Sequence, residues 1–203
     1  MSTLTTAEVT TSTLPSPART VIRWLVSFSG FPLGGLAAMT IVGPIDGLGA
    51  AVIGGLLTGL VLGVVQAWAL RLPRRTGLFW TLVTAAGLSL GLAVGASAVG
   101  FATGLADLQL QGAISGAAVG LTQAVLLWPR IGRWALAWPV YLAAAWATGW
   151  TVTTLIGVAV GEHFTVFGSA GAVTVAALTS MLPLLLRSRP AASSTHRTGS
   201  DIR

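Results

Sequence analysis

Long apolar runs without charge constrain this chain more than any other feature. They recur six times between residues 24 and 186, and arginines or short acidic turns separate them. A run of about 20 apolar residues is long enough to cross a bilayer as a helix. Of the 203 residues 8% are charged, against about 25% in a soluble domain. The sequence therefore predicts an all-α, polytopic membrane protein with six transmembrane helices.

The predicted spans follow one another through short connections. They cover about residues 24–43, 48–70, 78–101, 110–128, 134–160 and 166–186. Pro32 should kink the first span without ending it, and the fifth span is long enough to tilt or protrude. A cleavable signal peptide is the alternative for the first span, but an uncleaved helix fits its length better. The polar flanks 1–20 and 188–203 are predicted to be disordered tails around a membrane domain of residues 21–187.

The charges fall on alternate connections. All eleven basic residues are arginines, and with six spans they share one side with both termini. Asp46, Asp107 and Glu162 fall on the other side, and five or seven spans would break this alternation. Since cytoplasmic loops attract arginine, both termini are predicted to be cytoplasmic and the protein to lie in the inner (plasma) membrane. This distribution of the +6 net charge indicates anionic lipid head groups as partners and no nucleic acid.

A glycine-rich stretch with one glutamine occurs twice, 57 residues apart. The first copy has Gly55, Gly59, Gly63 and Gln66; the second has Gly112, Gly116, Gly120 and Gln123. A third, diverged copy keeps small residues but no glutamine, at Gly168, Ala172, Ala176 and Thr179. Ahead of each copy a tryptophan precedes a glycine by eleven residues, at Trp24, Trp80 and Trp138. The pattern predicts three helical hairpins, about 22–71, 76–130 and 134–187, related by an axis along the membrane normal. Chance similarity of composition is the alternative.

The six glycines of the two clear copies lie four residues apart and so line one face of each helix. Bare glycine faces let two membrane helices pack closely. The alternative role is to leave room for a ligand or a hinge. Gln66 and Gln123 lie on the same faces and need partners in hydrocarbon, because an unpaired amide there costs several kcal/mol. They are predicted to form interhelical hydrogen bonds, with the lining of a polar cavity as the alternative.

The remaining polar and aromatic residues are predicted near the span ends. Asp46, Asp107, Glu162 and His163 should lie in outer loops, either solvated or as a ring that attracts cations at a pore mouth. Six tryptophans are predicted to form an aromatic belt at the cytoplasmic head groups, namely Trp24, Trp68, Trp80, Trp128, Trp134 and Trp138. Trp146 and Trp150 should pack inside the bundle.

Chemistry-bearing patterns are missing from the sequence. No acid, arginine or histidine falls in the middle of a predicted span, where proton relays and ion-coupled transporters need one. Glu162 and His163 are too few for a zinc site or a hydrolytic triad. With no cysteine, thiolate sites are excluded. We therefore expect no enzyme, no catalytic residue, no cofactor and no metal.

One resemblance rests on the repeated motif. Gly59, Gly63, Gln66, Leu70 and Arg71 form a GxxxGxxQ…LR pattern before a basic loop and the next tryptophan-led helix. The chain thereby resembles a loose group of small bacterial multi-pass membrane proteins with the same repeated motif. The likeness covers about half of the chain, and the second copy has Trp128 where the group would have arginine. The resemblance implies a topology and no activity.

Two functions remain open at this stage. The first is a non-enzymatic structural or interaction component, acting as a homo-oligomer or with another membrane protein. The alternative is a small-solute or ion permease or channel, or the membrane substrate-binding subunit of a transporter. A continuous cavity that reaches both glutamines would favour transport, whereas paired glutamines in a filled interior would favour the structural function.

Overall fold

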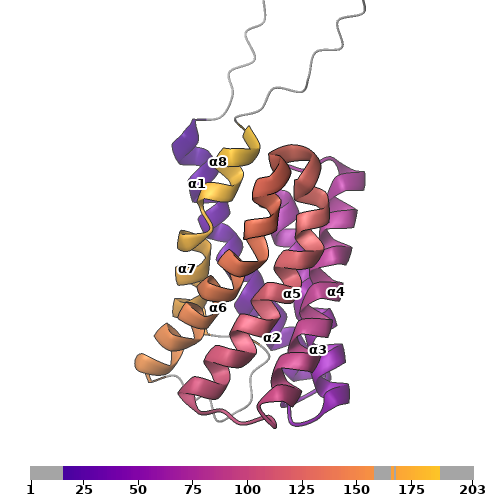
Figure 1. The fold of residues 1–203 in the computed structure, drawn as a ribbon, viewed down its shortest axis with the longest axis vertical. Coiled ribbons are helices and arrows are strands. Elements are labelled where there is room, and N and C mark those ends of the chain that lie inside the picture. Colours follow the sequence, from indigo (N-terminus) through magenta and orange to yellow (C-terminus); the bar gives the residue numbers. More distant parts are fainter. Residues whose placement is uncertain (1–15, 158–165, 167, 188–203) are drawn as a thin grey trace, which may run out of the picture.

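The computed structural model describes residues 16–157, 166 and 168–187, and the regular structure in this part of the chain is helical (Figure 1). The α-helices are α1 (Pro17–Val26), α2 (Gly30–Ile41), α3 (Leu48–Ala69), α4 (Arg74–Ala98), α5 (Leu105–Ile131), α6 (Trp138–Leu155), α7 (Ser169–Leu178) and α8 (Met181–Arg187). Two 3-10 turns, η1 (Ser27–Ser29) and η2 (Gly132–Ala137), join α1 to α2 and α5 to α6.

Five of the described helical stretches are long and apolar enough to cross a membrane. They are Pro17–Ile41, Leu48–Ala69, Arg74–Ala98, Leu105–Leu155 and Ser169–Arg187. The fourth has 51 residues and consists of α5 and α6, which fold back on each other at η2. The prediction of an all-helical chain whose helices can span a membrane is confirmed.

The helices form one bundle and run along its long dimension (Figure 1). Neighbours in sequence from α3 to α6 pack pairwise, and α7 and α8 lie against α6 and α1, which closes the bundle. Large apolar side chains cover its outside; Leu36, Val64, Val125 and Val140 are each more than half exposed. A soluble monomer rarely exposes so much contiguous apolar surface, so this exterior suits lipid.

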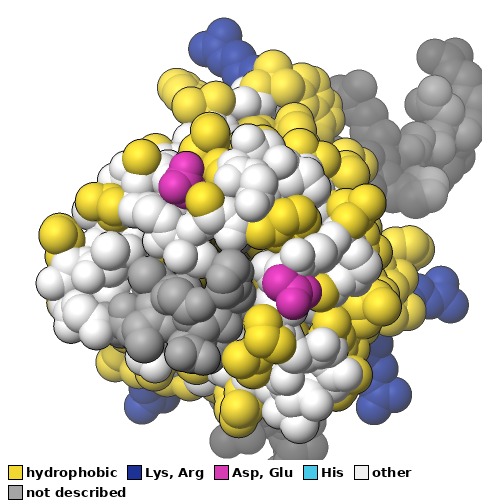
Figure 2. Space-filling view, turned by 90° about the horizontal axis from the view of Figure 1, so that it is seen from below, with side chains coloured by type: hydrophobic (Ala, Val, Ile, Leu, Met, Phe, Trp, Pro, Cys, Tyr) yellow, Lys and Arg dark blue, Asp and Glu magenta, His cyan; other side chains and the backbone are white. Residues whose placement is uncertain are grey.

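The charges of the described residues separate between the two ends of the bundle. Asp46, between α2 and α3, and Asp107, in the first turn of α5, lie at the lower end (Figures 1 and 2). The arginines lie in α1, between α3 and α4, at the start of α4, around η2 and at the end of α8, all at the upper end of Figure 1. The described arginines and acids therefore lie at opposite ends of the bundle, as the directions of the successive helices require.

Helix α1 begins inside the segment predicted to be a disordered tail. The prediction of a tail over residues 1–20 is wrong for its last four residues, because α1 starts at Pro17. The Ser16 hydroxyl accepts a hydrogen bond from the Arg19 N–H at 3.3 Å, and proline suits the first helical position, where its missing N–H is not needed. Residues 1–15 and 188–203 lie outside the described residues.

Two prolines interrupt predicted spans by the same mechanism. Pro32 has no N–H for the carbonyl of Phe28, and the helix tightens into η1 over Ser27–Ser29. Pro183 has none for the carbonyl of Thr179, and the predicted span 166–186 is divided there into α7 and α8. Neither predicted span is therefore one uniform α-helix.

Glycines, more than prolines, end the long helices around η2 and after α6. Helix α5 continues through Pro129, where a stop was predicted, and ends at Ile131, just before Gly132 with φ +59°. Helix α6 ends at Leu155, before Gly157 with φ +78°, so it is shorter than the predicted span 134–160. Positive φ is open to glycine at little cost, which makes these positions natural ends. Residues 158–160 lie outside the described residues.

Candidate functional site

Glycines bring the backbones of α3 and α4 into contact. A Cβ atom added at Gly59 would lie 2.5 Å from the Cα atom of Ala85, and one at Gly63 would lie 2.6 Å from that of Thr81. Gly55 faces α4 in the same way. Since Cβ atoms essentially never approach backbone below 3.0 Å, a larger residue here would push the two helices apart.

The second glycine series does the same for α5 and α6. A Cβ atom added at Gly116 would lie 2.5 Å from the carbonyl oxygen of Leu142, and one at Gly120 would lie 2.5 Å from the Cα atom of Pro139. Gly112 also faces α6. In both pairs, dispersion between closely packed backbones holds the helices together. The two series thus position the residues that follow them on the same faces.

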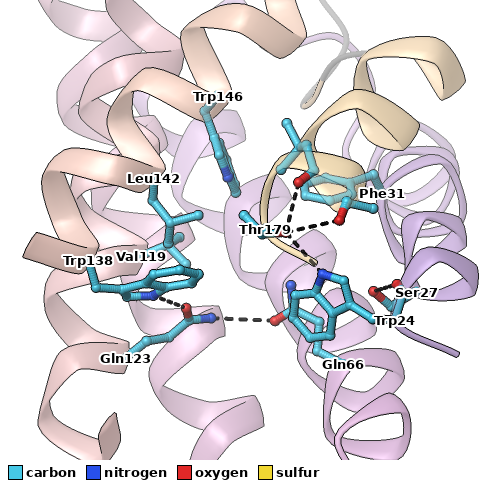
Figure 3. Close-up of a pocket in the computed structure, with 12 residues that line it drawn as sticks. Trp24, Ser27, Phe31, Gln66, Val119, Gln123, Trp138, Leu142, Trp146 and Thr179 are labelled. Atoms are coloured by element: carbon cyan, nitrogen blue, oxygen red, sulfur yellow. Dashed lines mark hydrogen bonds between the residues drawn. The ribbon is translucent and has the colours of Figure 1, made fainter. Parts of the chain in front are cut away.

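Those residues, Gln66 and Gln123, meet inside the bundle (Figure 3). The Nε2 atom of Gln123 lies 3.4 Å from Oε1 of Gln66 and 3.0 Å from Oγ1 of Thr84. Gln123 is buried and Gln66 is half-buried. The structure therefore links α3, α4 and α5 through two amides and one hydroxyl.

Two tryptophans complete the hydrogen bonding of the glutamines. The indole N–H of Trp80, on α4, donates to Oε1 of Gln66 at 3.1 Å. The indole N–H of Trp138, on α6, donates to Oε1 of Gln123 at 3.0 Å. Each tryptophan thus bonds to the glutamine on the helix before its own, and the amide oxygens are satisfied inside the bundle.

A third tryptophan closes the series. Trp24, on α1, donates its indole N–H to Oγ1 of Thr179 at 3.0 Å (Figure 3). The hydroxyl of Thr179 in turn donates to the carbonyl of Val175 at 2.7 Å. This bond joins the first described helix to the end of α7, across 155 residues. The three indole bonds therefore run around the bundle from α1 through α4 and α6, each reaching a polar residue on a neighbouring helix.

These tryptophans do not belong to an aromatic belt. Trp24, Trp80 and Trp138 are only 2%, 3% and 5% exposed, so the belt prediction is wrong for them. The other three are exposed at 51–66%, namely Trp68, Trp128 and Trp134. The spacing of 56 and 58 residues between the buried three is within one residue of the 57-residue spacing of the glutamines. A buried amide needs hydrogen-bond donors, and tryptophans at nearly the same spacing could supply them. These two observations together could have predicted that the three tryptophans lie inside the bundle.

The space between the polar groups is small. A cavity of about 10 Å³ lies among Trp24, Gln66, Gln123, Trp138 and Thr179, and a water molecule needs about 10–15 Å³ by this measure. Trp146, also buried, packs edge-on against Phe31 at 5.5 Å beside the same space. This cavity therefore has room for about one water molecule.

The chemistry open to this cluster is hydrogen bonding. Amide, hydroxyl and indole groups donate and accept hydrogen bonds, and none of them titrates near neutral pH. Two further hydroxyls, those of Ser115 and Thr153, are buried without a hydrogen-bond partner among the described residues. Sequence reasoning did not single out either of them, since serine and threonine in a helix usually bond the carbonyl four residues back.

The predicted outer acids are not brought into this cluster. Asp46 is exposed and Asp107 is half-buried, both at the opposite end from the arginines, and neither forms a hydrogen bond or ion pair with another described residue. Glu162 and His163 lie outside the described residues. Among the described residues, no three His, Cys, Asp or Glu side chains lie close enough together to hold a metal ion.

Comparison with protein-family models, with curated proteins and with solved structures found no match for this chain. The resemblance to the group with the repeated GxxxGxxQ…LR motif therefore stays a prediction.

Proposed function

We propose that the chain crosses the membrane six times, as three helical hairpins. The 51-residue stretch Leu105–Leu155 supplies two crossings in this scheme, because α5 and α6 turn back at η2 and pack against each other. Helix α5, with 27 residues, is about 40 Å long and α6, with 18 residues, about 27 Å. Each is close to or above the roughly 30 Å of a hydrocarbon core.

The indole bonds support a pseudo-threefold arrangement of these hairpins. The tryptophan of the second hairpin bonds to Gln66 of the first, and that of the third bonds to Gln123 of the second. The tryptophan of the first bonds to Thr179 of the third, which occupies the position of the missing glutamine. Three equivalent bonds that return to their starting hairpin fit rotation about an axis along the membrane normal.

The separation of charge supports the proposed orientation. Every described arginine lies at the end of the bundle that carries both described chain ends, Ser16 and Arg187, and both described acids lie at the other. By the positive-inside rule the arginine end faces the cytoplasm. The membrane is then the inner (plasma) membrane of a cell, with anionic lipid head groups around the arginines.

Within that membrane, we propose that the protein is a non-enzymatic structural or interaction component. The observation that carries this proposal is the closed set of hydrogen bonds around a cavity of about 10 Å³. Both amide oxygens accept hydrogen bonds from tryptophans, and the Gln123 amide donates to Gln66 and Thr84, which is what a helix-joining role requires. A small-solute or ion permease or channel, or a transporter subunit, would instead need a continuous route past them. The extensive apolar exterior can also pack against a second copy of the chain or against another membrane protein, and these are the partners that we propose.

Reconstitution separates the two functions. The wild-type chain and its Gln66→Leu/Gln123→Leu variant are inserted into proteoliposomes, and the release of entrapped glycerol, K⁺ and Cl⁻ is measured against protein-free vesicles. The structural function predicts that neither protein raises release above the protein-free rate, while the double variant unfolds at a lower temperature.

A matched control keeps this result interpretable. Gln109→Leu removes an amide that bonds Thr151 at 2.8 Å and takes no part in the three indole hydrogen bonds. Suppose that the wild type releases solute, that Gln109→Leu still does so and that the double variant does not. This result would establish a route past Gln66 and Gln123 and would refute the structural function.

A further inference from the structure

Four arginines line a hollow at the arginine end of the bundle. The hollow has a volume of about 260 Å³ and lies between α1, the end of α3, α5 and α8. The four are Arg23, Arg71, Arg130 and Arg187, and each comes from a different segment of the fold. None of its lining residues is acidic. Four cations gathered around one space favour an anion within it.

Two of the arginines are held in place by their neighbours. The Nη2 atom of Arg23 donates to the carbonyl of Trp68 at 2.6 Å, and its guanidinium carbon lies 5.1 Å from the centre of the Trp68 ring. The Nη1 atom of Arg187 donates to Oγ1 of Thr20 at 2.6 Å. Because a guanidinium has five N–H donors in a planar fork, the bond to Trp68 leaves Arg23 further donors for a ligand. Such fixed forks match the oxygens of a phosphate group.

Arg71 occupies a backbone position that favours glycine. Its φ is +55°, the left-handed conformation that other residues rarely adopt. It lies two residues after the end of α3, in a Schellman turn in which Arg71 N–H bonds the carbonyl of Trp68 and Leu72 N–H bonds that of Ala67, both at 3.0 Å. The chain therefore carries a cation where glycine would relieve strain, and strain of this kind gathers at binding sites.

A second hollow shares Arg23 and Arg71 with the first. It has a volume of about 500 Å³ and lies between α1, α3 and α4. Its wall includes Val64 and Leu78, which are more than half exposed on the outside of the bundle. The two arginines thus border both hollows. Arg74 also lines the second hollow, next to its apolar side chains, and a phospholipid head group and its acyl chain would fill this arrangement.

We propose that the hollow lined by Arg23, Arg71, Arg130 and Arg187 is a binding site for a phosphate-bearing anion. Basic pockets at the cytoplasmic ends of membrane helices are known to suit anionic head groups. The phosphate can come from an anionic phospholipid, whose acyl chain lies in the second hollow, or from a soluble phosphate compound. The site goes beyond the proposed structural function and does not depend on it.

The test removes the cation at Arg71 without straining the backbone. Arg71→Gly and Arg71→Asn both replace arginine by residues that accept positive φ, so the turn after α3 is retained. Arg133→Gln is the matched control, because Arg133 lies at the same end, stacks over Trp134 at 5.9 Å and lines neither hollow. Each full-length protein is purified in a zwitterionic detergent, and its thermal unfolding midpoint is followed.

Two probes distinguish the sources of the phosphate. One series titrates inorganic phosphate against chloride at constant ionic strength. The other adds phosphatidylglycerol or phosphatidylcholine to the micelles, and native mass spectrometry counts the retained lipid. A ligand that binds the folded chain raises the midpoint as its concentration passes its Kd. A response to phosphatidylglycerol alone identifies a lipid site, and a response to inorganic phosphate identifies a site open to soluble phosphate.

For either probe we expect apparent affinity to fall at least tenfold in both Arg71 variants and less than twofold in Arg133→Gln. Equal losses in the Arg71 variants and the control would show that total charge, and not the hollow, attracts the anion, and would overturn the proposal. A wild-type chain that responds to neither probe would also overturn it.

Discussion

Replacing Gln123 by leucine should destabilise the bundle more than its lost packing would suggest. Leucine has a volume close to that of glutamine but no polar atom, so Gln123→Leu removes three hydrogen bonds at once. They join its amide to Gln66 at 3.4 Å, to Thr84 at 3.0 Å and to Trp138 at 3.0 Å. The indole N–H of Trp138, only 5% exposed, then has no acceptor. Gln66 keeps its bond from Trp80, but the Trp138 indole and the Thr84 hydroxyl stay buried without replacement bonds.

The magnitude follows from the orphaned indole. A buried donor left unpaired costs about 1–3 kcal/mol, and each further interhelical bond in a membrane contributes about 0.6 kcal/mol on average. The apolar contacts of leucine offset part of the sum. We expect a net loss of about 2 kcal/mol, or about 30-fold in the unfolding equilibrium.

Gln109→Leu is the matched control. It breaks the bond from Gln109 Nε2 to Thr151 Oγ1, but the Thr151 hydroxyl keeps its own bond to the carbonyl of Ala147 at 2.8 Å. No buried donor is orphaned, so the expected loss is about 0.6 kcal/mol or less.

A double-mutant cycle with Trp138→Phe isolates the indole bond. Phenylalanine removes the donor, so the double variant Gln123→Leu/Trp138→Phe leaves no orphaned N–H and should be about 1 kcal/mol more stable than the two single losses predict. Reversible unfolding in mixed micelles, followed by tryptophan fluorescence, measures all four proteins. The reasoning is refuted if Gln123→Leu costs no more than Gln109→Leu, or if the cycle is additive.

Three further predictions test packing, the orphaned hydroxyls and topology. Gly59→Ala should lower the free energy of unfolding by several kcal/mol, because its Cβ atom would meet backbone at 2.5 Å. Gly49 has open space around it, so Gly49→Ala should raise the free energy of unfolding by less than about 1 kcal/mol. Equal effects of the two substitutions in chemical unfolding would contradict the packing argument. Ser115→Ala removes a buried hydroxyl without a partner among the described residues and should be neutral or stabilising by up to about 1 kcal/mol, so a clear loss would reveal a bond that this geometry lacks. The chain has no cysteine, so single substitutions Gly47→Cys and Thr76→Cys can be labelled in intact cells with a membrane-impermeant maleimide; only Gly47→Cys should react before lysis, and labelling of both would contradict the proposed orientation.

The helices and their polarity could be read from the sequence, because a bilayer imposes simple requirements. Length and lack of charge define the spans, and the arginines mark one end. The bounds were less predictable, since they depend on single backbone positions. Gly132 and Gly157 end helices through positive φ, and Pro183 breaks one through a missing N–H, whereas Pro129 sits inside α5. Composition does not distinguish a proline that breaks a helix from one that the last turn tolerates.

The polar interior was predictable in part. Repeated spacing indicated that Gln66 and Gln123 each lie on the glycine face of their own helix and need partners, and they do meet. The tryptophans were placed at the lipid interface because an indole near a span end is usually found there. An amphipathic ring suits both an interface and a buried hydrogen bond, so its position near a span end does not decide between them. The nearly equal spacing of the tryptophans and the glutamines would have favoured the buried hydrogen bond.

Thr179 shows why the third copy of the motif looks lost when residue types are compared. Trp24 needs a buried acceptor, and a threonine hydroxyl tied to the carbonyl of Val175 directs its oxygen to the indole at 3.0 Å. Gln66 and Gln123 meet the same need with an amide oxygen. What recurs along the chain is therefore an acceptor at one helix position and an indole donor on the next helix. Under the proposed three-hairpin arrangement, a search of the sequence by hydrogen-bonding role finds three copies where a search by residue type finds two.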